Sequence, residues 1–174
     1  MRTPVDQNLV DEILRVYKPH CRYLKSAEVE TPSDGSPFPV ALVGKFAIEE
    51  SCYIDDTGHL NAVEVNIAFN QAYYVVTAHA IAHGLVPQLE AWTPEMFRKW
   101  YLEGSLIHDL RSTFKTVIDP RSFEGEIAIA NALRTKNFVV LKLTHRFWDA
   151  QGGLAKGRVT MALGRGKPGE GDDA

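Results

Sequence analysis

The stretch GHLNAVEVNIAFNQAYYVVTAHAIAHG, residues 58–84, predicts one long and almost entirely apolar helix, around which the rest of the chain must pack. Glu64 is the only carboxylate between residues 61 and 84, and Gly84 provides a stop signal. We expect the helix to run from near Asn61 to about His83, which is roughly six turns at about 3.6 residues per turn. A helix that is apolar on nearly every side is typical of a buried position. This helix is therefore expected at the centre of the protein.

The first third of the chain predicts a surface helix and two strands. An amphipathic helix is expected over residues 4–18, with Pro4 in its first turn and Pro19 ending it. Strands are expected within residues 21–30 and 40–50, and the segment TPSDGSPFP between them is a loop by composition.

The second half of the chain predicts a short helix followed by several strands. A short helix is expected at residues 93–104, with Thr93 as N-cap, Pro94 at the first position and Gly104 after the end. Four segments rich in β-branched and aromatic residues follow, at 105–119, 122–136, 138–150 and 157–164. Their short connections predict an antiparallel meander. Because a curved antiparallel sheet must cover its apolar face, the expected fold is α+β. It is the hotdog fold, a curved antiparallel sheet wrapped around one long central helix.

Length and composition indicate an ordinary globular chain. The 174 residues are 45% hydrophobic and 24% charged, which predicts a single domain with an N-terminal helix over residues 1–163. The remainder, residues 164–174, is expected to be a flexible charged tail. A net charge of −3 gives no reason to expect nucleic acid as a partner. No run approaches the ~18 apolar residues of a membrane span. Two cysteines outside any CxxC pair, Cys21 and Cys52, favour a reducing cytoplasm.

One face of the long helix carries a polar stripe. At about 100° per residue, its members fall within about 60° of one another; they are Asn66, Asn70, Tyr73 and Thr77. A buried amide without a partner costs roughly 1–3 kcal/mol. The stripe is therefore either a satisfied polar seam, for example at a dimer interface, or one wall of a cavity that holds a ligand.

The start of the helix offers a second concentration of polar groups. The free N–H groups and positive dipole end of a helix favour developing negative charge, such as that on a thioester carbonyl under attack. Glu64 is explained either by the dipole or as a general base, and His59 either as a solvated turn residue or as part of a site. Cys52 is interpreted as an inert thiol rather than a nucleophile, because no base is dedicated to it.

Other recognisable chemistry is missing from the sequence. There is no GxSxG elbow, Walker loop, GxGxxG or HExxH, and no metal site is expected. Basic residues alternate along the later segments, namely Arg111, Lys115, Arg134, Lys136, Lys142 and Arg146. They are either a solvated face or a docking surface for an acidic carrier protein or for the phosphates of coenzyme A.

The segment EESCYIDDTGHLNAVEVNIAFNQAYYVV, residues 49–76, resembles the FcoT-like hotdog proteins of actinobacteria. These proteins were described as long-chain acyl-CoA thioesterases and later as (2E)-enoyl-[acyl-carrier-protein] glycyltransferases of isonitrile lipopeptide pathways. The resemblance extends over nearly the whole chain except the charged tail. It implies a site built from Tyr53, Asn61 and Asn70, together with an N-terminal tyrosine, Tyr23 or, as a second choice, Tyr17.

The resemblance implies Michael-type addition of glycine to an α,β-unsaturated fatty acyl thioester on an acyl carrier protein. Asn70 or the first-turn amides would polarise the carbonyl with Asn61 nearby, and Tyr53 would donate a hydrogen bond. Glu64 or His59 would accept the amine proton. The substrate-binding residues expected are Tyr23, Asn66, Tyr73 and Thr77. No cofactor is expected beyond the phosphopantetheine arm of the carrier, and the chain is expected to form a homodimer or higher oligomer.

Two alternatives to glycine addition stay open. The same polarised carbonyl would serve hydrolysis of an acyl thioester, which many hotdog enzymes perform, and a non-enzymatic lipid-binding or assembly role is the third. The known hotdog dehydratase pattern does not fit, since the position about four turns after His59 is Tyr73 rather than a carboxylate.

Overall fold

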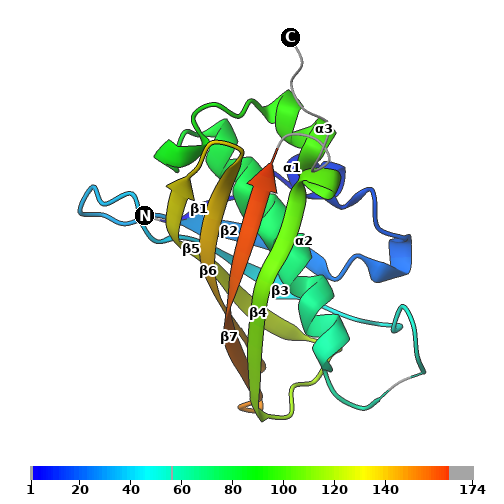
Figure 1. Cartoon of the computed structure of the whole chain (residues 1–174). Helices are drawn as coiled ribbons and strands as arrows, with labels where there is room; N and C mark the ends of the chain where they lie inside the picture. The colour runs from blue at the N-terminus through cyan, green and yellow to red at the C-terminus, as the bar shows by residue number, and fades with distance from the viewer. Residues whose placement is uncertain (1, 56, 165–174) are drawn as a thin grey trace.

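The computed structural model describes residues 2–55 and 57–164 and shows a curved antiparallel sheet wrapped around one long helix, α2 (Figure 1). The helices are α1 (Gln7–Leu14), α2 (Ala62–Ala82) and α3 (Pro94–Gly104). The strands are β1 (Arg2–Pro4), β2 (Leu24–Glu30), β3 (Val40–Phe46), β4 (Ser105–Thr116), β5 (Phe123–Arg134), β6 (Phe138–Trp148) and β7 (Leu154–Gly164). Short 3₁₀ turns occur at Pro19–Cys21 and Pro87–Leu89. The predicted hotdog fold is confirmed.

Helix α2 fills the concave side of the sheet, as its composition predicts. Every residue from Ala68 to Ala80 is buried except Asn70, which is half-buried. Inward-facing side chains such as Ile127 and Leu141 are fully buried in the same core. Removal of this much apolar surface from water is the main force that holds the sheet around the helix.

The ends of α2 are fixed by the residues that the sequence indicates. Asn61 is the N-cap residue, and Gly84 follows the end with a φ of +63°, a left-handed conformation that favours glycine. The His83 ring nitrogen Nδ1 lies 2.9 Å from the carbonyl oxygen of His79, so His83 caps the C-terminal end. The sequence prediction of both boundaries is therefore confirmed.

The predicted meander is wrong for β4. The strand order is β1-β2-β3-β5-β6-β7-β4, so β5, β6 and β7 form a meander but β4 pairs with β7 at the far edge. The connection at residues 117–122 crosses the end of the wrapped sheet instead of making a hairpin. It is held there because Leu60 N donates to Ile118 O and Ile48 N donates to Pro120 O, each at 2.9 Å, and because Ile118 is buried.

The N-terminal segment also differs from the prediction. Helix α1 begins only at Gln7, because the Asp6 side chain caps it by accepting from Asn8 N at 2.9 Å, and it ends at Leu14, before Pro19. Residues 2–4 instead form β1, which pairs with β2 at the sheet edge, where a proline is tolerated.

Other predicted boundaries differ by a few residues. The strand prediction for residues 40–50 is too long, because β3 ends at Phe46 and a loop follows. Gly104 is the last residue of α3 rather than the residue after it. Of the predicted tail, Gly164 ends β7 and residues 165–174 lie outside the described part. No helix in the described ranges is long and apolar enough to cross a membrane.

Candidate functional site

A cavity of about 530 Å³ lies beside the first turn of α2. Its walls come from the loop after β3, the first turn of α2, the 3₁₀ turn before β2 and the crossing connection at 117–122. Three of the sequence-predicted residues line it: Tyr53, His59 and Glu64. The chain thus brings segments separated by about a hundred residues, as with His20 and Arg121, to one polar hollow.

Asn61 and Glu64 form a capping box beside this cavity, and of the two only Glu64 lines it. Asn61 Oδ1 accepts hydrogen bonds from Val63 N at 3.0 Å and Glu64 N at 3.2 Å, and Glu64 Oε2 accepts from Asn61 N at 3.2 Å. Glu64 is only 3% exposed. The interpretation of Glu64 as a carboxylate that stabilises the helix start is therefore supported. Of its two oxygens, only Oε2 takes part in the capping box.

The amide nitrogen of Asn61 has no hydrogen-bond partner in the described part of the chain, although it is buried. A buried N–H donor without a partner costs free energy, and it lies at the electropositive end of α2. Asn61 does not itself line the cavity, so a ligand atom would meet this donor only by reaching past its neighbour Glu64.

Two further hydroxyl groups near the cavity are buried without partners among the described residues. They belong to Tyr23 and to Ser51, and Ser51 is one of the cavity-lining residues. The sequence interpretation missed Ser51, because a serine in a polar loop carries no spacing signal. Together with Asn61, these residues provide three unpaired polar atoms around one end of the helix.

Tyr23 is fully buried and lies against the thiol of Cys52, which lines the cavity. Burial, and then the contact with Cys52, raise the pKa of the Tyr23 phenol. Burial and the neighbouring Cys52 thiol likewise raise the pKa of Cys21, so this thiol is protonated at neutral pH. Both cysteines are free. These shifts keep Cys21 and Tyr23 protonated and make Tyr23 a hydrogen-bond donor rather than a base.

Gln71, which the sequence interpretation also missed, holds Tyr23 in place. Gln71 Oε1 accepts from Tyr23 N at 2.9 Å and from Leu24 N at 3.0 Å, while Gln71 Nε2 donates to Cys21 O at 2.6 Å. This fully buried side chain ties the start of β2 to α2. Its polar character on an apolar helix was the available signal, since a buried amide requires partners.

Tyr53 and His59 lie on the open side of the cavity. The Tyr53 side chain is 51% exposed, and His59 is exposed with Nδ1 3.0 Å from Thr57 O. Both are therefore accessible to a substrate without any rearrangement of the core.

The polar stripe lies elsewhere, on the side of α2 that faces β4. The Tyr73 hydroxyl is 3.3 Å from Ser105 Oγ of β4, and burial raises its pKa, against a smaller lowering by the Ser105 and Thr77 hydroxyls. Asn70 Nδ2 is 3.5 Å from Asn66 Oδ1, a weak contact, and both side chains are half-buried. None of these four stripe residues lines the cavity at the helix start.

The nine predicted site residues therefore divide between two places. Tyr53, His59 and Glu64 line the cavity, whereas Asn61 and Tyr23 do not line it but contact the lining residues Glu64 and Cys52. The four stripe residues lie along the helix toward the edge strand β4. Within the described ranges, no three His, Cys, Asp or Glu side chains gather as a metal-binding group. The cavity is lined by four carboxylates, those of Glu49, Glu50, Asp55 and Glu64, beside His20, His59 and Arg121. It therefore combines groups that can accept a proton with groups that can donate hydrogen bonds to an acyl group.

Comparison with known proteins shows relatives over almost the whole chain. A sequence model described as "FcoT-like thioesterase domain" matches residues 12–163. A "(2E)-enoyl-[ACP] glycyltransferase" from Streptomyces coeruleorubidus is 41% identical over 163 residues, which cover 91% of this chain and 96% of the relative. A protein of the same name from Mycobacterium marinum (strain ATCC BAA-535 / M) is 34% identical over 92% of this chain and 87% of the relative.

Solved structures with low sequence identity share the fold. The dehydratase domain of RzxB from Pseudomonas fluorescens superposes with a TM-score of 0.57 at 14% identity, over 93% of this chain and 50% of that one. Zebra fish thioesterase superfamily member 2 superposes with a TM-score of 0.51 at 10% identity, over 90% and 94% of the two chains. One sheet-and-helix scaffold thus carries different chemistries.

Proposed function

Because the chain belongs to the FcoT-like thioesterase domain family, we propose that it adds glycine to the β-carbon of an α,β-unsaturated fatty acyl thioester. The acyl group is carried on an acyl carrier protein, and the product is a 3-(carboxymethylamino)acyl thioester. Relatives that match more than nine tenths of this chain bear the name (2E)-enoyl-[ACP] glycyltransferase, which supports the assignment.

One observation carries the proposal: the unpaired Asn61 amide and the Glu64 carboxylate share the first turn of α2. Asn61 Nδ2 is a buried donor without a partner among the described residues, and Glu64 reaches the cavity with Oε1 uncommitted. Attack on a conjugated thioester requires a donor for the carbonyl oxygen and an acceptor for the amine proton. The helix start supplies both groups.

The proposed reaction balances without any redox change. The glycine nitrogen attacks the β-carbon, a C–N bond forms, and the electron pair of the double bond moves to the thioester oxygen as an enolate. The Asn61 amide and the positive end of the α2 dipole stabilise this oxygen, and Glu64 accepts a proton from the ammonium. A proton then returns to the α-carbon. Since no electrons leave or enter, the phosphopantetheine arm of the carrier is the only prosthetic group the step requires.

Residues on the open side of the cavity are proposed to bind glycine. Tyr53 and His59 are exposed at its rim, where a phenol and an imidazole are suited to hydrogen-bond the glycine carboxylate. The buried Tyr23 hydroxyl, without a partner in the described chain, provides a further donor below them.

We propose that the polar stripe and β4 meet a second copy of the chain. Strand β4 is an edge strand of twelve residues, and its Leu106 and Phe114 side chains are 60% and 41% exposed. An uncovered edge of this length offers unpaired backbone N–H and C=O groups to another strand, and large apolar side chains stand exposed among its charged ones. A second β4, paired antiparallel, would cover this edge and bring partner atoms beside the half-buried Asn66 and Asn70, completing the acyl-binding side of the site.

The remaining assignments are proposals of the same kind. Two free thiols, Cys21 and Cys52, suit the reducing cytoplasm. The resemblance to FcoT-like proteins supports a place in isonitrile lipopeptide biosynthesis. If the chain acts in that pathway, a producing strain that lacks it is expected to lose the lipopeptide, and complementation is expected to restore it.

Thioester hydrolysis is the second candidate, and the printed family description favours it. The same donors would polarise the carbonyl for water instead of for the β-carbon attack. The discriminating experiment incubates crotonyl-carrier protein with the chain, with and without glycine, and follows intact mass and free thiol. A mass gain of one glycine that depends on the chain supports addition, whereas glycine-independent thiol release with no mass gain refutes it in favour of hydrolysis.

A further inference from the structure

The outer face of the sheet, away from α2, carries a groove of about 540 Å³ that spans β4 to β7. Four exposed cations line it: Arg111, Arg146, Lys156 and Arg158. Among the described residues its lining contains a single carboxylate, Glu126. This cationic groove stands out in a chain whose net charge is −3.

The cations of the groove are placed opposite one another. Arg146 of β6 is the cross-strand partner of Lys156 of β7, and Arg158 of β7 is the partner of Arg111 of β4. Like charges directly opposite each other on neighbouring strands destabilise a sheet. The arrangement therefore costs folding free energy that a neutral or mixed pair would not cost.

The chain compensates these charges only in part: Glu126 of β5 is the cross-strand partner of Arg146. Arg111 Nε lies 3.6 Å from Asp109 Oδ1, and the Arg146 guanidinium lies over the Trp148 ring at 5.0 Å. Within the described ranges no carboxylate forms an ion pair with Arg146, Lys156 or Arg158. The positive potential is thus left open to an anionic partner.

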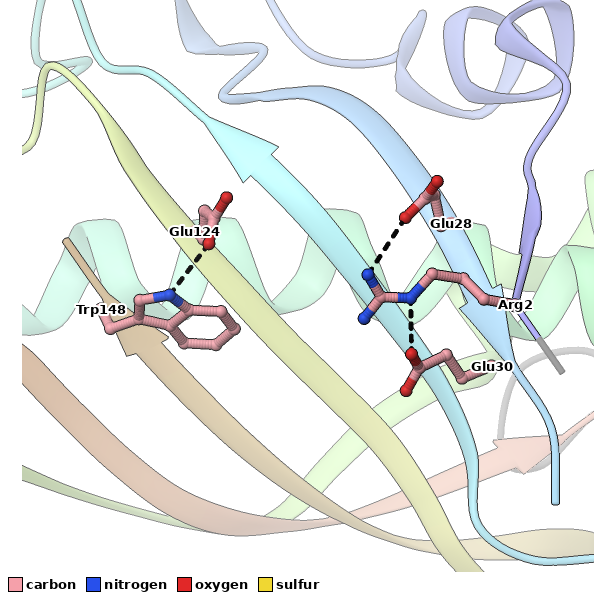
Figure 2. A network of polar contacts seen from close by, with 5 residues as sticks. All are labelled: Arg2, Glu28, Glu30, Glu124 and Trp148. Carbon is pink, nitrogen blue, oxygen red and sulfur yellow. Dashed lines mark hydrogen bonds and ion pairs between the residues drawn. The ribbon is translucent and has the colours of Figure 1, made fainter. Parts of the chain in front are cut away.

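The other half of the same face is built differently (Figure 2). There Arg2 forms ion pairs with Glu28 and Glu30, and the Trp148 indole N–H donates to Glu124 at 2.9 Å. On that half three carboxylates lie beside two cations, Arg2 and Lys45, so the excess of cations is a local feature of β4, β6 and β7.

The groove opens toward the end of the sheet where the candidate site lies. Arg146 and Lys156 are each two residues from the point where β6 ends and β7 begins. At that end lies a second hollow of about 480 Å³. Its lining comes from the β4–β5 connection, the β6–β7 connection and Gly58, and it shares Pro120 and Arg121 with the site cavity. The second hollow, which also carries Asp119 and Asp149, therefore lies between the end of the sheet nearest the groove and the start of α2.

We propose that the cationic groove docks the acidic acyl carrier protein that delivers the enoyl thioester, an inference that rests on the proposed function. The carrier's acidic surface offers the matching charge, and its pantetheine arm extends around the sheet end to the site cavity. Charge complementarity of this kind raises the association rate and weakens with salt.

The double variant Lys156→Glu/Arg158→Glu tests the proposal, because each substitution turns a like-charge pair into an opposite-charge pair. The fold is expected to be at least as stable as the parent, checked by thermal unfolding. With crotonyl-carrier protein we expect the KM to rise by about tenfold and its salt dependence to flatten. With crotonyl-pantetheine, which lacks the protein, the KM and kcat are expected to stay unchanged.

Lys99→Glu/Lys136→Glu is the matched control, since it changes the net charge equally on α3 and on the β5–β6 turn, away from the groove. An equal rise of KM in this control, a rise with the pantetheine substrate, or no rise at all would overturn the proposal. A rise with crotonyl-coenzyme A but not with the carrier would also overturn it, in favour of coenzyme phosphates. Direct binding of the carrier, measured by fluorescence anisotropy, tests docking even if no glycine addition occurs.

Discussion

Asn61 and Glu64 bind each other's backbone at the start of α2: Asn61 Oδ1 accepts from Glu64 N at 3.2 Å, and Glu64 Oε2 accepts from Asn61 N at 3.2 Å. This reciprocal contact satisfies two of the free N–H groups of the helix end. It also orients the two groups that the proposed reaction uses, so that Asn61 Nδ2 and Glu64 Oε1 remain available. Structural and chemical roles are thus carried by different atoms of the same side chains.

Substitutions of Asn61 can separate those roles. Asn61→Ser keeps an oxygen that caps the helix but removes the amide donor, so we expect stability within about 0.5 kcal/mol of the parent. Asn61→Ala removes both functions and is expected to lower the unfolding free energy by about 1 kcal/mol. Both variants are expected to lose about 10²-fold in kcat for glycine addition. Chemical denaturation and steady-state kinetics on the two proteins check this, and a fully active Asn61→Ser variant would show that the donor plays no part.

Glu64→Gln provides the matching test of the proton acceptor. A glutamine oxygen can still accept from Asn61 N, so the capping box and the stability are expected to persist. The amide cannot take a proton from the glycine ammonium, and the rate of addition is expected to fall by roughly 10²–10⁴-fold. His59→Gln is the comparison, because His59 is the other proposed acceptor and lines the same cavity. A larger loss in His59→Gln than in Glu64→Gln would reassign the base to His59.

His145 is expected to make the fold sensitive to acid. It is buried on the sheet face that packs on α2, where its ring contacts Phe69 and its Nε2 lies 3.1 Å from Ser112 Oγ. Burial lowers its pKa from 6.5 to about 4. The unfolded chain then binds more protons than the folded chain between these values, so stability is complete above pH 6.5 and declines toward pH 4. The loss from this residue reaches at most about 3 kcal/mol, at about 1.4 kcal/mol for each pKa unit.

The check is urea denaturation at a series of pH values, with His145→Gln beside the parent. The variant should show a shallower decline below pH 6.5, whereas His20→Gln, at an exposed histidine, should leave the slope unchanged. His79, whose pKa is lowered to about 4 by burial and by His83, accounts for part of the decline that remains. Identical slopes for parent and His145→Gln would contradict the assignment.

Local signals were sufficient to predict the elements that decide the fold. The apolar stretch that became α2, its Asn61 and Gly84 boundaries and the Thr93 cap of α3 each depend on neighbouring residues alone. The position of β4 could not be predicted in the same way, because its pairing with β7 depends on how the connection at 117–122 crosses the sheet end. That crossing is fixed by hydrogen bonds to residues 48 and 60, far away in sequence.

The candidate site shows the same division. Residues next to the helix start, such as His59 and Glu64, were found from sequence because the helix end itself indicates them. Ser51 and Gln71 were missed. Ser51 matters because its hydroxyl is buried without a partner among the described residues. Gln71 matters because it forms hydrogen bonds with the backbone of residues 21–24, which are distant in sequence. The stripe from Asn66 to Thr77 was predicted from its helical period. Only the structure shows that these residues do not line the cavity.

The edge strand β4 provides the last prediction, that the chain self-associates through it. Leu106→Lys/Leu110→Lys places charges at exposed positions of β4, where we expect less than about 1 kcal/mol of change in the stability of the single chain. Charges on an edge strand oppose pairing with another strand, so the variant should elute as a monomer in size-exclusion chromatography with light scattering. The rate of glycine addition by this variant should also fall, because Asn66 and Asn70 would face water instead of a partner chain.

Leu133→Lys, at a 64% exposed site on β5, is the control that should leave the assembly unchanged. A parent chain that is monomeric at micromolar concentration and active would refute pairing through β4.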